Sequence, residues 1–229
     1  DFLGTWLNAA EQSAAYVKGR TIDEKSPKMS KHYQFEGYLS LTGSSADERI
    51  VHKPSQTGAI AVALLAAVGG TVTAPSIADA KVNAAINKIA GELKAAQGKA
   101  VVVCGSNDAN IQTVVNAINS AIGAFGTTID FSAPLTSRKG DDKAFADLIA
   151  QMEAGTVGTI IIHNANPAYD YVDADKFKKA LAKVKNTISL GYRLDETSSL
   201  CKFIAPTHHY LESWGDAEPK SGFYSFMQP

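Results

Sequence analysis

Polar residues of types that could bind a nucleotide occur in three short segments, and each segment directly follows an apolar run. Their side-chain amides, carboxylates and hydroxyls donate and accept hydrogen bonds, so they could bind the edge of a nucleobase, a ribose or a phosphate. Loops that follow parallel strands meet at one edge of a sheet, and we therefore expect the three segments to converge. The candidate binding residues are Gly105, Ser106 and Asn107 in the first segment, Asn164, Asn166 and Pro167 in the second, and Asp195, Glu196 and Thr197 in the third.

Each segment also has an ordinary structural interpretation. The first could hold a phosphate at a helix N-terminus, but the absence of a G-x-G-x-x-G pattern favours a plain turn. In the second, Pro167 forces Asn166 out of the helical region, which suits an Asx-type turn as well as a binding loop. Residues 195–197 could instead begin a helix whose dipole favours acidic residues, and this interpretation is slightly preferred.

The sequence predicts neither catalytic nor metal-ligating residues. His208 and His209 lie near Glu212 and Asp216, but adjacent histidines rarely converge on one ion and no H-E-x-x-H pattern is present. The two cysteines are 97 positions apart (201 − 104), whereas an iron–sulfur or structural zinc site needs about four converging ligands. A disulfide between them stays open. No G-x-S-x-G elbow marks a serine nucleophile.

Composition excludes some classes of partner. The net charge of −1 gives no reason to expect binding to nucleic acid. No apolar run reaches the ~18–20 residues that a membrane span needs, so we expect no direct insertion into a membrane. The chain starts at Asp1 without a methionine or a signal peptide, and we expect it to be a piece of a longer polypeptide.

Capped amphipathic helices alternate with apolar runs that are typical of buried parallel strands. This alternation predicts an α/β fold with a doubly wound, mostly parallel sheet of at least four strands and helices on both faces. Cys104, at the end of one run, is expected to be buried. The expected helices span residues 76–97, 108–123, 141–155 and 173–184, the buried strands 100–104 and 158–162, and the weaker strands 127–131 and 186–190.

Residues 1–55 do not follow this alternation. They predict a helix over residues 6–17 and a strand over residues 34–41, and one helix with one strand cannot form a core. The segment must pack either on the rest of the chain or on upstream chain. We therefore predict two domains: residues 1–55, the trailing part of an incomplete α/β lobe, and residues 56–229, the main α/β domain.

Several segments resemble the molybdopterin oxidoreductase (DMSO-reductase-like) superfamily over nearly the whole chain. Residues 164–167, Asn-Ala-Asn-Pro, resemble its glycine-asparagine-proline loop. Residues 195–197, Asp-Glu-Thr, resemble its Asp/Thr-Glu-Thr loop, which precedes a Leu-Pro or Ala-Pro step, here Ala205-Pro206. Residues 32–43 and 208–219 look like the iron–sulfur, molybdopterin-oxidoreductase-like subunit of alternative complex III, a membrane-bound quinol:electron-acceptor oxidoreductase.

The resemblance implies a part of a respiratory electron-transfer complex on the periplasmic side of the inner membrane. The superfamily holds molybdopterin guanine dinucleotide between two α/β lobes, whereas the alternative complex III subgroup lacks the molybdenum cofactor and carries its iron–sulfur clusters in a separate region. The chain would then be a scaffold without a cofactor or redox centre of its own, attached to the membrane through other subunits. Its parent is an oxidoreductase, and the chain alone is not expected to be catalytic.

The departures from the superfamily pattern bear on the alternatives. His163 and Asn164 stand where glycine lets the main chain approach a pyrophosphate, and Trp6 replaces a small turn residue. The resemblance therefore implies that the nine candidate residues bind weakly or are vestigial. The alternative is one wall of the bis-molybdopterin guanine dinucleotide cleft of an active molybdoenzyme. A free-standing nucleotide enzyme would need catalytic groups that the sequence does not contain.

Overall fold

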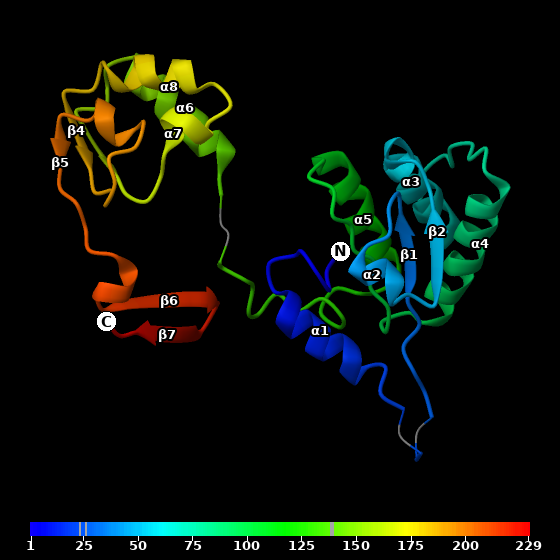
Figure 1. Cartoon of the computed structure of the whole chain (residues 1–229). Coiled ribbons are helices and arrows are strands. Elements are labelled where there is room, and N and C mark those ends of the chain that lie inside the picture. The colour runs from blue at the N-terminus through cyan, green and yellow to red at the C-terminus, as the bar shows by residue number, and fades with distance from the viewer. Residues whose placement is uncertain (23, 26, 138–139) are drawn as a thin grey trace. The chain divides into compact units, whose positions relative to one another are not determined.

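The computed structural model describes residues 1–22, 24–25, 27–137 and 140–229, and it forms two compact units. Unit 1 is Asp1–Pro134 and unit 2 is Leu135–Pro229 (Figure 1). Both contain helices and parallel strands, which confirms the predicted α/β fold class. The domain boundary predicted at residue 55 stays a prediction.

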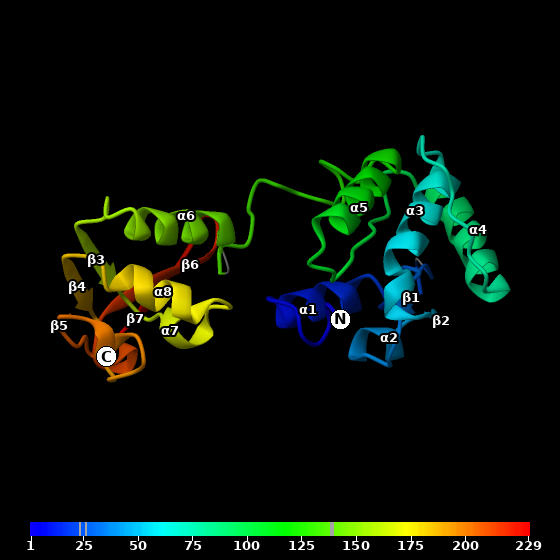
Figure 2. The ribbon, with the colours of Figure 1, turned by 90° about the horizontal axis from the view of Figure 1, so that it is seen from above.

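Unit 1 places one pair of strands against a group of helices. β1 and β2 are parallel, with Tyr33 opposite Glu48 and Glu36 opposite Val51. Figure 2 shows α3 between α4 and α5. The elements are α1 (Ala9–Lys18), β1 (Tyr33–Glu36), α2 (Leu41–Ser44), β2 (Glu48–Val51), the 3-10 turn η1 (Pro54–Gln56), α3 (Thr57–Val68), α4 (Ala80–Ala95) and α5 (Ala109–Ala121).

The core of unit 1 joins the N-terminal strands to the helices that follow them. Ile50 of β2 belongs to the same buried cluster as Leu64 of α3, Ile86 of α4 and Ile118 of α5, and Phe35 of β1 packs against this cluster. Residues 1–55 were predicted to pack either on the rest of the chain or on upstream chain. The structure shows that they pack on the rest of the chain. Burial of these large side chains is the main contribution to the stability of the unit.

Helix α4 starts later than the sequence predicts. Pro75 and Ser76 precede the helix, and Asp79 is its N-cap, accepting hydrogen bonds from the N–H groups of Lys81 at 2.8 Å and Val82 at 3.2 Å. The prediction of a start at residue 76 was wrong because a cap must satisfy the first free N–H groups, and the Asp79 carboxylate does so.

Residues 100–104 are not a paired strand, which corrects a second prediction. The side chain of Asn119 accepts a hydrogen bond from Val102 N at 2.9 Å and donates one to Val102 O at 2.8 Å. This buried amide takes the place of a neighbouring strand. Val101 and Val103 are 47% and 53% exposed, and Cys104 is half-buried rather than buried.

The weaker strand predicted over residues 127–131 is also absent. The described main chain there forms one isolated bridge, between Phe125 and Ile129. Thr127 and Thr128 instead bond back to the carbonyl groups that precede them, including Thr128 Oγ1 to Ala124 O at 3.3 Å. Threonine hydroxyls compete in this way with the hydrogen bonds of a strand.

Unit 2 contains a three-stranded parallel sheet in the order β3-β4-β5 and an antiparallel pair, β6-β7. A sheet of at least four strands within residues 100–205 was predicted, and the structure corrects this to three paired strands because residues 100–104 and 127–131 do not join a ladder. The elements are α6 (Asp142–Glu153), β3 (Thr159–Ile162), α7 (Pro167–Asp170), α8 (Ala174–Leu181), β4 (Asn186–Ser189), η2 (Ser198–Leu200), β5 (Phe203–Ile204), η3 (Tyr210–Glu212), β6 (Gly215–Lys220) and β7 (Phe223–Met227).

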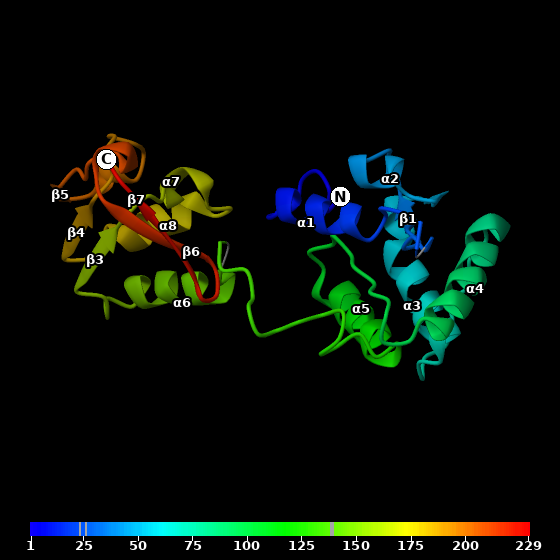
Figure 3. The same cartoon turned by 90° about the horizontal axis from the view of Figure 1, so that it is seen from below.

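The core of unit 2 lies between the sheet and two helices. Met152 of α6 and Phe177 of α8 are fully buried in a cluster with Ile162 of β3. Figure 3 shows α6 and α8 side by side, as their packing requires. The register pairs Ile162 with Ser189, so β3 and β4 end next to each other. The loops that follow these strands therefore begin side by side.

Candidate functional site

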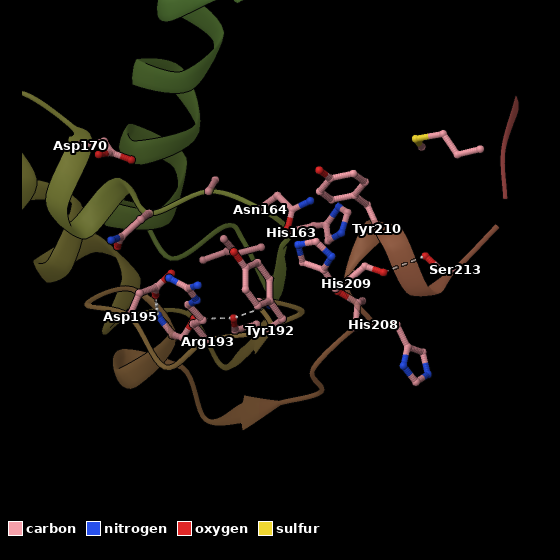
Figure 4. A pocket seen from close by; sticks show the side chains of 18 of the residues that line it. His163, Asn164, Asp170, Tyr192, Arg193, Asp195, His208, His209, Tyr210 and Ser213 are labelled. Atoms are coloured by element: carbon pink, nitrogen blue, oxygen red, sulfur yellow. Dashed lines mark hydrogen bonds between the residues drawn. The ribbon is translucent and has the colours of Figure 1, made fainter. Parts of the chain in front are cut away.

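A groove of about 1040 Å³ lies in unit 2 where these loops meet. Most of its lining comes from the loop after β3, the loop after β4 and the chain that leads into η3, and Asp216 of β6 and Met227 of β7 also line it. Figure 4 shows His163 and Asn164, from the loop after β3, near His209 and Tyr210, from the chain around the start of η3. Of the candidate residues predicted from sequence, the groove is lined by Asn164, Asn166 and Asp195. Its other polar lining residues include His163, Asp170, Tyr192, Arg193, His208, His209, Tyr210, Ser213 and Asp216.

The side chain of Asn166 is bound to the neighbouring loop. Its Oδ1 accepts hydrogen bonds from Thr197 N at 3.1 Å and Thr197 Oγ1 at 2.7 Å, and its Nδ2 donates to Glu196 Oε2 at 2.7 Å. Thr197, which is fully buried, also accepts from Ala168 N at 2.9 Å. We call these contacts between Asn166, Glu196 and Thr197 the amide clamp. The hydrogen bond from Asn166 lowers the pKa of the Glu196 carboxyl below its usual range.

Asp195 is likewise occupied within the loop. Its Oδ1 accepts from Ser198 N at 2.7 Å, which satisfies an N–H group at the start of η2. Ser198 Oγ and Ser189 Oγ lie 2.8 Å apart, and Ser189 Oγ accepts from Gly191 N at 3.1 Å. These contacts match the interpretation of residues 195–197 as the start of a helix.

Asn164 differs from its neighbours because its backbone is left-handed. Its φ of 51° is the single positive value among the described non-glycine residues. Asparagine tolerates this region better than most residues, although glycine enters it without steric cost. An asparagine can therefore stand at this turn where the superfamily has glycine.

An aromatic wall that the sequence analysis did not assign completes the groove. The rings of Tyr192 and His209 meet edge to face at 5.8 Å, and those of His209 and Tyr210 lie 4.5 Å apart. The Arg193 guanidinium lies 5.2 Å from the centre of the Tyr192 ring. Tyr192 and Arg193 directly follow the Gly191 turn after β4, and this position was a signal that could have identified them.

The structure gives no support to a metal site in the part of the chain that it describes. No three His, Cys, Asp or Glu side chains gather there as metal ligands would. His209 instead accepts a hydrogen bond from Leu211 N through Nδ1 at 3.3 Å. The expectation that the chain holds no metal stays a prediction.

In unit 1, the loop with Gly105, Ser106 and Asn107 matches the plain-turn interpretation. Ser106 Oγ accepts from Asp108 N at 3.1 Å, and Asp108 Oδ1 accepts from Asn110 N at 2.8 Å. Gln112 holds the loop further, since its Nε2 donates to Ser106 O at 2.6 Å. The N–H groups that a phosphate would need are thus partly occupied, and the Asp108 carboxylate would repel it.

The Trp6 indole lies against this loop. A Cβ placed on Gly105 would be 3.4 Å from Trp6 Cζ2. This would be an ordinary van der Waals contact, and the expectation that Trp6 crowds a cofactor stays a prediction. Whether this loop converges with the two loops of unit 2 stays a prediction.

No protein-family model matches the chain. A search of curated proteins finds similarity to a menaquinone reductase, molybdopterin-binding-like subunit, from Nitratidesulfovibrio vulgaris strain Hildenborough. The two are 28% identical over 195 residues, which cover 80% of this chain and 25% of that protein. The chain thus spans about a quarter of the length of this relative. The match supports a relationship to molybdopterin-oxidoreductase-like proteins.

Among the described helices, none is long and apolar enough to cross a membrane.

Proposed function

We propose that this chain is a structural scaffold within a molybdopterin-oxidoreductase-like subunit of a respiratory, quinone-linked oxidoreductase. The observation that carries the proposal is the amide clamp. Asn166, one of the nine candidate binding residues, uses both ends of its side-chain amide in hydrogen bonds to Thr197 and Glu196. It therefore fixes the loop after β3 to the loop after β4, which is the work of a scaffold.

The candidate residues do not fit a guanine dinucleotide cofactor. A guanine would have to break the hydrogen bonds of Asn166 and Asp195, and a buried Thr197 hydroxyl would lose its acceptor. Leaving a buried polar group unpaired costs about 1–3 kcal/mol. A pyrophosphate would meet the Asp108 carboxylate and the Trp6 indole beside Gly105. We therefore assign no redox step to the chain's own residues.

The name of the similar protein supports one part of the proposal, which is the presence of partner subunits. It is named as a subunit of a menaquinone reductase, and this favours other subunits as partners of the present chain. We propose an arrangement of the alternative complex III type, in which the scaffold lies on the periplasmic side of the inner membrane. Iron–sulfur clusters would then belong to other parts of the parent polypeptide.

Calorimetric titration of the 229-residue chain with GDP tests the proposal. We expect no binding tighter than about 1 mM, equivalent to ~4 kcal/mol, because the groups that would bind guanine are already paired. The variants Asn166→Ala and Asp195→Ala should lose stability and leave this result unchanged. Ser213→Ala is a matched control, because Ser213 lines the groove outside the amide clamp and donates at 3.4 Å to His209 O.

A second candidate function is one wall of the cofactor cleft of an active molybdoenzyme. The groove itself and its aromatic wall favour this alternative, since aromatic rings stack on heterocycles. A micromolar dissociation constant for GDP, abolished by Asn166→Ala or Asp195→Ala, would reject the scaffold and establish this alternative.

A further inference from the structure

Exposed lysines of unit 2 form a strip along one helix and one edge of the sheet, which we call the lysine strip. Its members are Lys176, Lys179, Lys183, Lys185 and Lys202. The first three lie on one flank of α8 and of the turn that continues it, because positions i, i+3 and i+7 fall on one side of a helix. The other two lie at the starts of neighbouring strands, since Lys185 directly precedes β4 and Lys202 directly precedes β5.

Hydrogen bonds and an ion pair show that these lysines are neighbours. The carboxylate of Glu153, at the end of α6, lies 3.8 Å from Lys176 Nζ, and its carbonyl oxygen accepts from Lys183 Nζ at 2.9 Å. Lys202 Nζ donates to Lys185 O at 2.6 Å. The strip thus runs from α8 to the edge of the sheet where β4 and β5 begin, and the groove lies at the opposite edge, where β3 and β4 end.

The lysine strip has an excess of positive charge. In the part of the chain that the structure describes, Glu153 is the one carboxylate that forms an ion pair with it. Lys183 and Lys202 donate to neutral carbonyl groups, and Lys179 and Lys185 form no ion pair with a described residue. Five lysines and one carboxylate leave four uncompensated positive charges, although the whole chain has a net charge of −1.

The chemistry of lysine favours a broad anionic surface over a single bound ion. An ammonium group is a point charge on a flexible stem, whereas recognition of one carboxylate or phosphate favours the planar fork of arginine. Arg193, the described arginine of unit 2, lines the groove and not the strip. A row of lysines is attracted by the many negative headgroups of a membrane, and each lysine near that surface raises the affinity about fivefold.

An exposed apolar row beside the strip favours a lipid surface over an acidic protein. Phe203 directly follows Lys202 and is 58% exposed. The register places Phe203 in one row with Ile188 of β4 and Ile161 of β3, on the face of the sheet opposite to the buried Ile162. Ile161 is 61% exposed, so the helices that cover Ile162 do not cover this row. Cationic side chains at the headgroups and apolar side chains at the acyl boundary together bind proteins to membrane surfaces.

We infer that unit 2 binds the surface of an anionic membrane through the lysine strip, with Phe203 entering the lipid interface. The contact is peripheral and adds to any attachment through other subunits. It does not depend on the proposed scaffold function, because the lysine strip and the groove lie at opposite edges of the sheet.

Sedimentation of the whole chain with lipid vesicles at neutral pH tests the inference. One set of vesicles contains phosphatidylcholine and phosphatidylglycerol in equal parts, and the other contains phosphatidylcholine alone. Binding to the anionic vesicles should be tighter by more than about tenfold, the effect of two or more lysines at the surface. It should be lost in about 1 M salt, where the screening length falls to about 3 Å. Equal binding to the two sets of vesicles would overturn the inference.

Paired substitutions locate the contact. Lys179→Gln combined with Lys185→Gln removes two charges of the strip and should weaken binding to the anionic vesicles by about 25-fold. Lys143→Gln combined with Lys178→Gln changes the net charge by the same amount outside the strip, at lysines already paired with carboxylates, and should have little effect. Equal weakening by the two double variants would mean that net charge, and not the strip, attracts the membrane.

Phe203→Ala distinguishes a lipid surface from an acidic polypeptide. It should weaken binding to the anionic vesicles several-fold, because an apolar side chain is lost from the lipid interface. It should leave binding of polyglutamate, measured by calorimetric titration, unchanged. Circular dichroism checks that the variant keeps its fold. If Phe203→Ala leaves vesicle binding unchanged, the strip recognises charge alone, and an acidic protein surface replaces the membrane as its partner.

Discussion

Residues 100–104 of unit 1 and strand β3 of unit 2 have nearly the same sequence character and different structures. Both are runs of β-branched apolar residues before a turn. β3 pairs with β4 along four residues, whereas residues 100–104 enter no ladder and are held by the side chain of Asn119. An apolar run therefore predicts an extended main chain, but it does not identify the group that satisfies its N–H and C=O groups.

The loops after the two segments differ in the same way. After residues 100–104, Gln112 and Ser106 fix the turn from within one helix and its cap. After β3, Asn166 accepts a hydrogen bond from Thr197 in the loop after β4, so the ends of two strands are joined. The first arrangement is local and the second connects distant parts of the chain. Substitutions can show how much the local and the long-range hydrogen bonds each contribute to the stability of the chain.

Asn119→Ala should have the largest effect. It removes both hydrogen bonds to Val102 and leaves that main chain unpaired, at a cost of about 2–3 kcal/mol. Urea unfolding followed by circular dichroism measures the loss. Asn116→Ala is the control, because Asn116 is exposed on the same helix and should change stability by less than ~0.5 kcal/mol. Equal effects of the two variants would show that Asn119 does not replace a strand.

Thr197→Val should have the next largest effect, about 1–2 kcal/mol. Valine keeps the shape but removes the hydroxyl that donates to Asn166 and accepts from Ala168 N. The same unfolding measurement applies to unit 2. Ser199→Ala, at an exposed residue two positions away, should be nearly neutral. A neutral Thr197→Val would mean that the amide clamp does not join the loops.

The two turns should also respond differently to alanine. Asn164→Ala should cost about 1 kcal/mol, because alanine is strained at a φ of 51°. Gly105→Ala should be nearly neutral, since its φ is not positive and the new Cβ would make an ordinary contact with Trp6. Differential scanning calorimetry of both variants tests the pair. A larger loss for Gly105→Ala would reverse the comparison.

The last expectation concerns the acid dependence of stability, which should change when Glu36 is replaced. Burial raises its pKa, but bonds from Ser40 and Arg49 lower it more, so the folded pKa lies below the ordinary 4.5. Its contribution to stability is present above pH 4.5 and is lost as the pH falls through the folded value. Unfolding curves between pH 7 and pH 3 should therefore show a weaker acid dependence in Glu36→Gln. An unchanged dependence would assign acid sensitivity to other carboxylates.

Sequence predicted the helices better than the strands. The caps Asp108, Asp141 and Asp173 were identified because a cap and its helix are neighbours in sequence. Strand pairing depends on distant residues, and the bond between Asn119 and Val102 spans 17 positions of sequence. The pattern of a single segment contains no information on such a partner.

The candidate site shows the same limit. Sequence predicted that the loops after β3 and β4 lie together, and Asn166 and Thr197 confirm this with hydrogen bonds across 31 positions. It did not predict that these side chains would pair with each other, because the types that bind a nucleotide also bind a main chain. The aromatic wall was missed because Tyr192 and Tyr210 come from separate segments.

The β6–β7 pair has a consequence for the behaviour of the chain in concentrated solution. Every residue of β7 is exposed, including Phe223 at 59% and Phe226 at 80%. The pair is tied to the start of unit 2 by a hydrogen bond of 2.9 Å from Thr136 N to Pro219 O and by a bridge between Leu135 and Lys220. An exposed aromatic edge strand is a template for intermolecular pairing. We therefore expect these exposed aromatic residues to favour association between chains at high concentration, and a charge at Phe226 should raise the concentration at which the chain precipitates.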